Sequence, residues 1–213
     1  MFNIKLNLLI VFCLISIVTL HVAASESGYA IRANEQSRIA HEAFYEFSSK
    51  CQDKDIEIKE VCEAYKTYKK AVKTSNRTNI LVEEKRFEGF KEDYYPEMSK
   101  VQRKDIESAY RAYIRAIKAD QKAVEAEHCA IYNVAKADRN CKISKTGSDK
   151  KIAKARECLK KMKKRREVAY TQRKAAYDIY VPKMQIIREG DNIFTRVKKR
   201  TKIYKQNRGK MEG

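Results

Sequence analysis

Residues that interrupt α-helices are scarce in this chain of 213 residues, which contains only two prolines, Pro96 and Pro182, and six glycines. The rest of the composition is rich in Lys, Glu, Ala, Arg and Tyr, which favours helices over a β-sandwich or a disulfide-dense knot. Between residues 98 and 138 most apolar side chains recur every three or four positions, with charged residues between them. This spacing predicts one long amphipathic helix, so we expect an all-α fold.

The ends of the helices are predicted from the places where this spacing fails. The polar segment 74–79 reads as a loop, and it contains the N-glycosylation acceptor Asn76 in the sequence Asn-Arg-Thr. Segment 144–149 is typical of a turn. Each proline predicts a helix that ends or bends, because proline lacks the backbone N–H group. The tyrosines at helical spacing are predicted to pack in the core.

The first residues have the composition of a secretory signal peptide. One lysine precedes an apolar run that ends in small residues near position 24. We therefore expect a signal peptide at 1–24 and a secreted mature chain at 25–213, which forms a single helical domain with a frayed basic tail at 205–213. No later segment is apolar enough to predict a membrane span.

An internal duplication is predicted from landmarks that occur twice in the same order. Cys51 and Cys62 are matched by Cys141 and Cys158, and an aspartate expected to cap a helix lies nine residues before the second cysteine of each pair. A Tyr-x-Pro-x-Met sequence then follows in both copies. The fold class that we expect is two diverged repeats, about 28–100 and 101–204, of disulfide-stapled antiparallel helical hairpins packed into one domain.

Five cysteines follow the predicted signal peptide. A disulfide requires Cα atoms within about 7 Å, so the chain must reverse between the members of each expected pair, Cys51–Cys62 and Cys141–Cys158. Cys129 would remain unpaired. His128 precedes it, but neighbouring side chains on a helix point about 100° apart and do not form a catalytic pair. No cysteine pair has zinc spacing, and we expect no metal and no cofactor.

A basic cluster follows Cys158, with six cations in seven residues: Lys160, Lys161, Lys163, Lys164, Arg165 and Arg166. Without the single lysine of the predicted signal peptide, the chain has 46 basic and 28 acidic residues, a net charge of +18. Such a charge attracts acidic surfaces. The cluster is interpreted as a site for nucleic acid, as a site for an anionic polysaccharide or lipid, as a nuclear import signal in a foreign cell, or as a merely solvated face.

Motifs of enzymes are missing from the sequence. It contains no Gly-rich phosphate loop, no Gly-x-Ser-x-Gly elbow and no His-Glu-x-x-His sequence. These absences favour binding over catalysis, and we expect no small-molecule substrate. The partner is predicted to be a host protein or a polyanion.

The chain resembles the bicycle proteins of aphids, a family of secreted salivary proteins named for paired cysteine-tyrosine-cysteine motifs. Cys129, Tyr132 and Cys141 have this order, whereas the first unit has cysteine, cysteine and then tyrosine. The resemblance implies a non-enzymatic effector that is delivered with saliva into plant tissue, binds a host component and alters host development or defence, as in gall formation. The alternative is a basic polyanion-binding protein in the saliva or venom of another arthropod.

Overall fold

The structure is a computed structural model that describes residues 28–144 and 148–189. Within these residues there are helices and turns but no strands, so the all-α prediction is confirmed. The predicted signal peptide and the basic tail lie outside the described residues. The elements are an N-terminal helix at 28–52, α2 (Ile58–Tyr94), the short 3-10 helix η1 (Tyr95–Glu97), α3 (Lys100–Ser144) and α4 (Ser148–Glu189).

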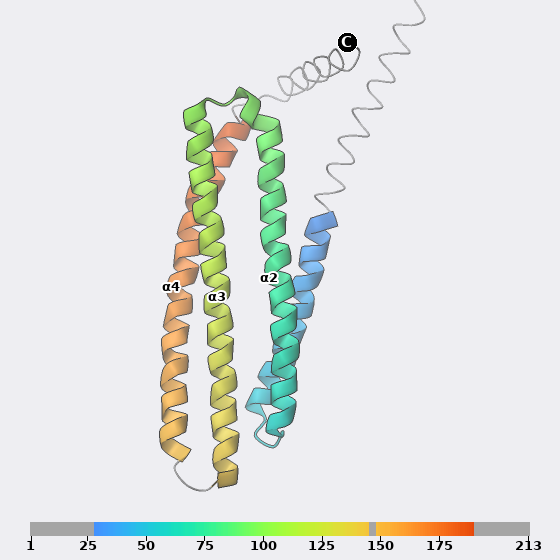
Figure 1. Ribbon diagram of the computed structural model, residues 1–213, viewed down its shortest axis with the longest axis vertical. Coiled ribbons are helices and arrows are strands. Elements are labelled where there is room, and N and C mark those ends of the chain that lie inside the picture. The colour runs from blue at the N-terminus through green and yellow to red at the C-terminus, as the bar shows by residue number, and fades with distance from the viewer. Residues whose placement is uncertain (1–27, 145–147, 190–213) are drawn as a thin grey trace, which may run out of the picture.

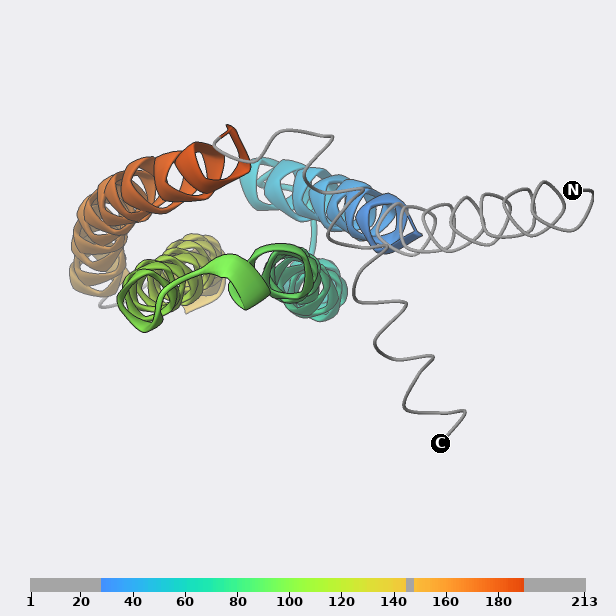
Figure 2. The ribbon, with the colours of Figure 1, turned by 90° about the horizontal axis from the view of Figure 1, so that it is seen from above.

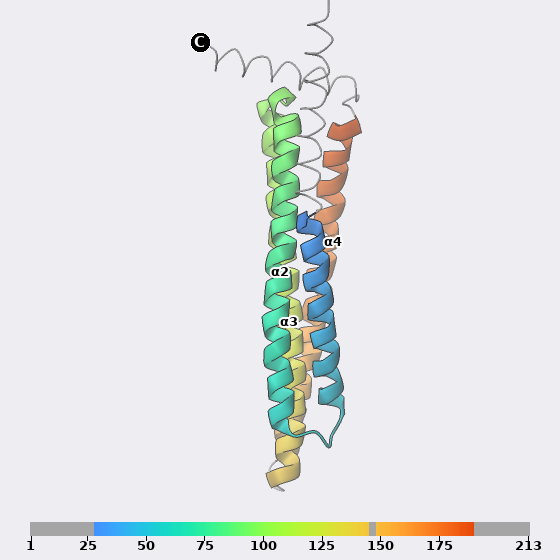
Figure 3. The same cartoon turned by 90° about the vertical axis from the view of Figure 1, so that its right-hand side faces the viewer.

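The four long helices lie side by side and alternate in direction along an elongated bundle (Figure 1). Viewed from above, α2 and α3 form one layer, and the N-terminal helix and α4 lie on the same side of that layer (Figure 2). The N-terminal helix is the shortest of the four, and it covers only the lower part of α2 in the side view (Figure 3). Among the described residues, the layer that contains α4 therefore has a second helix only along the lower part of the bundle.

Helix α3 forms where the apolar spacing predicts a helix and continues beyond it to Ser144. Its start is fixed by a reciprocal pair of hydrogen bonds. The amide N–H of Gln102 donates to Ser99 Oγ (3.2 Å), and the amide N–H of Ser99 donates to Gln102 Oε1 (2.9 Å). This capping box satisfies two backbone donors that have no partner inside the helix.

Two separate apolar cores hold the bundle together. The upper core joins the end of α2, the start of α3 and the end of α4, and it is centred on Phe90 and Ile106. Tyr180 of α4 stacks on Tyr113 of α3 with ring centroids 5.2 Å apart. The lower core joins the N-terminal helix to α2 and α3 around Phe47. Tyrosines at helical spacing contribute to both cores, as the sequence predicted.

The predicted loop at 74–79 is wrong, because these residues lie within α2. The hydroxyls of Thr74 and Thr78 each donate to the carbonyl oxygen four residues earlier, which satisfies them on the helix itself. Ser75 is buried and its Oγ lies 3.2 Å from Ser37 Oγ of the N-terminal helix. Polar residues that resemble a loop therefore pair within and between helices.

The two prolines behave differently. Pro96 lies in η1, where α2 has ended and the chain turns toward α3, as predicted. Pro182 lies inside α4, which continues to Glu189, so the helix does not end there, and a bend at this proline stays a prediction. Tyr180 and Met184 on either side of Pro182 are buried in the upper core. The packing of Tyr180 and Met184 stabilises α4 on both sides of Pro182, although Pro182 has no backbone N–H to donate to the helix.

Each predicted unit does contain an antiparallel pair of helices: the N-terminal helix with α2, and α3 with α4. The expected aspartate caps are wrong. Asp53 Oδ1 accepts from the amide N–H of Asp55 (2.9 Å), while Glu57 occupies the N-cap of α2. Asp149 lies within the first turn of α4. A common origin of the two pairs stays a prediction.

Candidate functional site

Positive charge is concentrated on α4. This helix of 42 residues carries fourteen Lys and Arg against five Asp and Glu, a net charge of +9. The N-terminal helix carries three of each sign and is neutral. Half of the +18 expected for the mature chain therefore lies on one helix at one side of the bundle.

The direction and register of α4 are fixed by ion pairs with α3. Arg173 Nη1 lies 2.9 Å from Asp120 Oδ2, and seven residues away Arg166 Nη1 lies 3.1 Å from Glu127 Oε2. Both carboxylate side chains are only 8% exposed. A buried carboxylate must be paired, because an unpaired charge in the interior is strongly destabilising. These two pairs therefore specify how the antiparallel helices align.

The predicted basic cluster contains two residues that form ion pairs with other described residues and four that do not. Arg166 is occupied by Glu127 and belongs to the α3–α4 interface. Lys161 pairs with Glu157 of its own helix at 2.9 Å. The other four cations are exposed and form no ion pair with the described part of the chain; we call them the α4 basic surface: Lys160, Lys163, Lys164 and Arg165. Lys160 shares a helix face with both Lys163 and Lys164.

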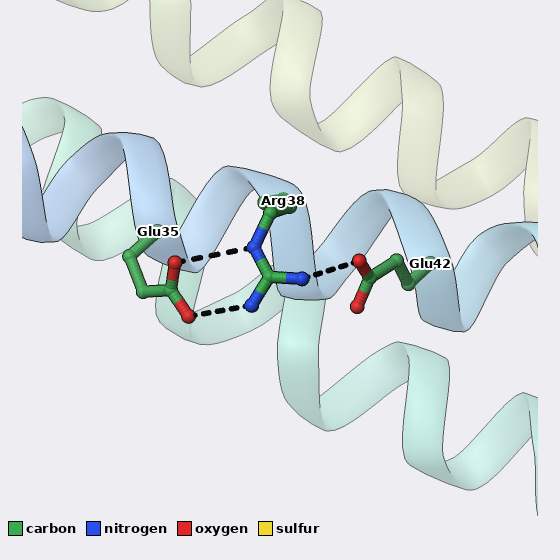
Figure 4. Close-up of polar contacts among 3 residues, drawn as sticks. All are labelled: Glu35, Arg38 and Glu42. Carbon is green, nitrogen blue, oxygen red and sulfur yellow. Dashed lines mark hydrogen bonds and ion pairs between the residues drawn. The ribbon is translucent and has the colours of Figure 1, made fainter.

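Five of the six charged side chains of the N-terminal helix are, by contrast, paired within that helix. Arg38 donates through Nε and Nη2 to the two carboxylate oxygens of Glu35 (3.2 and 2.8 Å) and through Nη1 to Glu42 (Figure 4). The guanidinium keeps the pKa of Glu35 below its usual value, through the hydrogen bond first and its charge second. Lys50 pairs with Glu46 at 3.1 Å. This helix therefore offers little uncompensated charge to a partner.

The cysteines whose side chains are described, Cys51, Cys62, Cys129 and Cys158, are free thiols in this structure. The side chain of Cys141 lies outside the described residues. The predicted disulfides are therefore absent among the described residues. The alignment of the helices still shows which cysteines lie at the same height along two neighbouring helices.

Cys51 and Cys62 lie at nearly the same height in the first helix pair. Ser37 contacts Ser75, and ten residues along the N-terminal helix Phe47 contacts Tyr65, with ring centroids 5.2 Å apart. Four more residues in the same directions place Cys51 level with position 61, next to Cys62. This alignment favours the predicted pairing.

Cys141 and Cys158 are not level in the second helix pair. Asp138 contacts Arg156 at 3.5 Å, so Cys141 is level with position 153 of α4. Cys158 lies five residues farther along, which is about 7.5 Å along the helix axis at 1.5 Å per residue. That axial offset alone exceeds the Cα separation of ordinary disulfides.

The turn that the first disulfide was expected to fasten is held instead by Arg139 of α3. Its buried guanidinium donates to four carbonyl oxygens, of which three lie at the turn between the N-terminal helix and α2. They are Lys50 in the last turn of that helix (2.5 Å), and Asp53 (2.5 Å) and Ile56 (2.9 Å) in the joining segment. The fourth is Ala135 of its own helix, at 3.0 Å. Sequence reasoning missed Arg139, because its partners lie more than 80 residues away along the chain.

Two Cys-x-x-Tyr sequences meet between α2 and α3. The rings of Tyr65 and Tyr132 stack with centroids 4.5 Å apart. Each tyrosine also interacts with the thiol of the other sequence, Tyr132 with Cys62 and Tyr65 with Cys129. The Cys62 thiol, followed by burial, raises the pKa of Tyr132 to about 12. Burial raises the pKa of the nearby Cys51 thiol to about 11. At neutral pH Cys51 is therefore a protonated thiol and a weak nucleophile.

His128 and Cys129 have different partners, as their positions on a helix predict. His128 Nδ1 bonds to the Tyr68 hydroxyl, and its ring stacks on Phe44 with centroids 4.3 Å apart. Cys129 Sγ lies 3.9 Å from Asn133 Nδ2. His128 therefore functions here as part of the lower core.

The glycosylation acceptor Asn76 lies on α2 rather than in a loop. Its Nδ2 donates to Glu125 Oε1 of α3 at 2.9 Å, and its carbonyl oxygen accepts from Gln121 Nε2 at 3.3 Å. Attachment of a glycan would replace one of the two hydrogens of this Nδ2. Glycosylation at Asn76 stays a prediction.

The described residues contain no group of three or more potential ligands that would hold a metal ion, and none of their helices is long and apolar enough to cross a membrane. No protein-family model, curated protein or solved structure matches the chain.

Proposed function

We propose that the protein is a secreted, non-enzymatic binding protein whose α4 basic surface docks on a linear polyanion. The supporting observation is that four exposed cations, Lys160, Lys163, Lys164 and Arg165, lie together without an ion-pair partner in the described part of the chain. Such a cluster creates a positive potential that attracts phosphate, sulfate or carboxylate groups. The helix that carries it is about 63 Å long, which suits an extended polymer.

Repulsion within the cluster argues against a merely solvated face. Glu157 raises the pKa of Lys161 through a hydrogen bond and its charge, and the nearby charge of Arg165 opposes this rise. Like charges held together on one rigid helix repel one another, and an anionic partner relieves that repulsion. On the N-terminal helix, by comparison, five of the six charged side chains are paired.

The test is retention of the mature protein on three polyanions: heparin, duplex DNA and polygalacturonate. The variant Lys160→Gln/Lys163→Gln/Lys164→Gln/Arg165→Gln leaves Arg166 and Lys161 intact, so the α3–α4 interface is preserved. We expect it to elute at much lower salt from the polymer that the wild type prefers. The preferred column distinguishes sulfate, phosphate and carboxylate polymers.

A matched control removes the same charge from another helix. Lys66, Lys69, Lys70 and Lys73 are exposed on α2, and changing them to Gln lowers the net charge by the same four units. If both variants lose retention equally, only net charge matters, and the proposal of a docking surface on α4 is wrong.

We propose that this binding occurs in the tissue of a host, where the protein acts as an effector. The predicted signal peptide and the cysteine-tyrosine pattern support this setting. Because a run of basic residues can act as a nuclear import signal, the proposal includes the nucleus of the host cell. Enrichment of the transcript in a salivary or venom gland is expected. Even expression across all tissues of the source animal would overturn this part of the proposal.

We also propose that Cys51 and Cys62 form a disulfide in the secretory compartment by exchange with a disulfide donor. Their similar height in the first helix pair supports it. Peptide mapping without reduction should recover this link, whereas the offset of Cys141 from Cys158 predicts no link between that pair. A map that shows free thiols at Cys51 and Cys62 in the secreted protein would contradict the proposal.

A further inference from the structure

A cavity of about 450 Å³ lies in the middle of the bundle, between the two apolar cores. All four long helices contribute to its wall. Its volume lies within the range of small-molecule sites, which occur between the helices of bundles. Nothing in the sequence motifs predicts a site at this position.

The cavity exists because the N-terminal helix changes from large to small side chains along its inner face. In the lower core Phe44 and Phe47 fill the space against α2 and α3. About three turns earlier the helix presents Ala30 and Ala33 to the cavity. Alanine is too short to fill this space, which stays open between the helices.

Charged groups of both signs line the cavity in equal number. Asp120 pairs with Arg173 between α3 and α4, and Glu83 pairs with Arg86 on α2 with an Nη1–Oε1 distance of 2.8 Å. Each of these four side chains is held through one atom in the pair, which leaves further N–H groups and carboxylate oxygens to bind a ligand. The four formal charges cancel, so the site favours a ligand without net charge.

The remaining wall suits a flat apolar group. Tyr113 lines the cavity beside Val82, Ile117 and Val124. Its ring also contacts Tyr177 of α4, with centroids 5.8 Å apart, which restrains its orientation. An aromatic ring packs favourably against such a surface.

We propose that this cavity binds a small zwitterion that carries an aromatic ring, of the class of free aromatic α-amino acids. The ligand carboxylate accepts from Arg173 or Arg86, the ammonium group donates to Asp120 or Glu83, and the ring packs beside Tyr113. A ligand with a net negative charge would be repelled by the two carboxylates, and one with a net positive charge by the two guanidinium groups. A zwitterion can place its carboxylate beside a guanidinium group and its ammonium group beside a carboxylate. The cavity lies outside the α4 basic surface, so this proposal is independent of polyanion binding.

The experiment is isothermal titration of the mature protein with free L-tryptophan, L-tyrosine and L-phenylalanine at low salt. We expect saturable one-site binding to at least one of the three. Indole and p-cresol are the matched uncharged probes, and they are expected to bind at least roughly tenfold more weakly, because charge-assisted hydrogen bonds are lost.

Two variants locate the site. Ala33→Leu fills the cavity from the N-terminal helix and should abolish binding while the helical circular dichroism stays unchanged. Asp120→Asn/Arg173→Gln removes the charges of the interhelical pair and should weaken binding roughly tenfold to a hundredfold.

The control for the second variant is Glu127→Gln/Arg166→Gln, one heptad away. It removes a pair with equally buried carboxylate and similar geometry that does not line the cavity. We expect a similar loss of stability in urea but unchanged affinity for the amino acid. This pair of variants separates ligand contact from general weakening of the α3–α4 interface.

Several results would overturn the proposal. They are no saturable binding of any of the three amino acids, equal affinity for the uncharged probes, undiminished binding to the Ala33→Leu variant, and equal loss of binding in both charge-pair variants. None of them affects the polyanion proposal, because heparin retention is measured separately on the α4 basic surface.

Discussion

Acidification is expected to destabilise this protein through His128. Its ring is buried between Phe44 and Tyr68, and its surface is 8% exposed. Burial lowers the pKa of His128 to about 4; the nearby Glu127 opposes the shift and Arg166 adds to it. Burial also raises the pKa of Tyr68, so its hydroxyl keeps its proton, and this hydroxyl forms a hydrogen bond with Nδ1 of the neutral ring.

The sign of the pH effect follows from this lowered pKa. In the unfolded chain histidine titrates near 6.5. Between this pH and about pH 4 the unfolded state therefore binds a proton at His128 that the folded state does not bind. The contribution of a neutral His128 is complete above pH 6.5 and is lost as the pH falls toward 4. Between pH 7 and pH 5 the free energy of unfolding should fall by about 2 kcal/mol from this site.

The assay is urea unfolding of the wild type and of His128→Gln at several values between pH 7 and pH 5. Glutamine does not titrate, so the difference between the two proteins isolates the histidine from the carboxylates. We expect that difference to shrink by about 2 kcal/mol toward pH 5. Parallel curves for the two proteins would show that His128 titrates normally in the folded state and would refute the assignment of a buried neutral ring.

Other predictions concern stability. Arg139→Met should lower the free energy of unfolding by about 3 kcal/mol or more, measured in urea, because three part-buried hydrogen bonds from a charged donor are lost; a loss below about 1 kcal/mol would contradict its role. Phe90→Ala should cost about 3–5 kcal/mol in the same assay, because the side chain fills the upper core. Pro182→Ala should raise the melting temperature, since alanine restores an N–H donor at an exposed position inside α4; a lower melting temperature would show that the proline is required there.

Helices were predictable where one physical signal dominates. The apolar spacing between 98 and 138 predicts α3, and Pro96 marks the turn before it. The segment 74–79 was not predictable, because its helical state depends on contacts such as Ser75 with Ser37 of another helix. Tertiary contacts there override local preference.

In the candidate sites, too, some features are evident from the local sequence and others depend on contacts between helices. The charge of the basic cluster is evident in the sequence, but only the alignment with α3 removes Arg166 from it by pairing that residue with Glu127. The cavity depends on Ala30 and Ala33 lying opposite Tyr113, which no local pattern reveals. Arg139 likewise acts on a turn far away along the chain. Residues whose role depends on the register between helices require the structure.

The central claim is that the α4 basic surface contacts the anionic groups of a polymer directly. The most direct measurement is the affinity for duplex DNA or heparin as a function of salt, for the wild type and for the α4 and α2 quadruple variants. Each lost contact with a DNA phosphate lowers the steepness of the log–log plot by about 0.9. The account predicts a decrease of about 3–4 for the α4 variant and almost none for the α2 variant. Equal slopes for the two variants would contradict it.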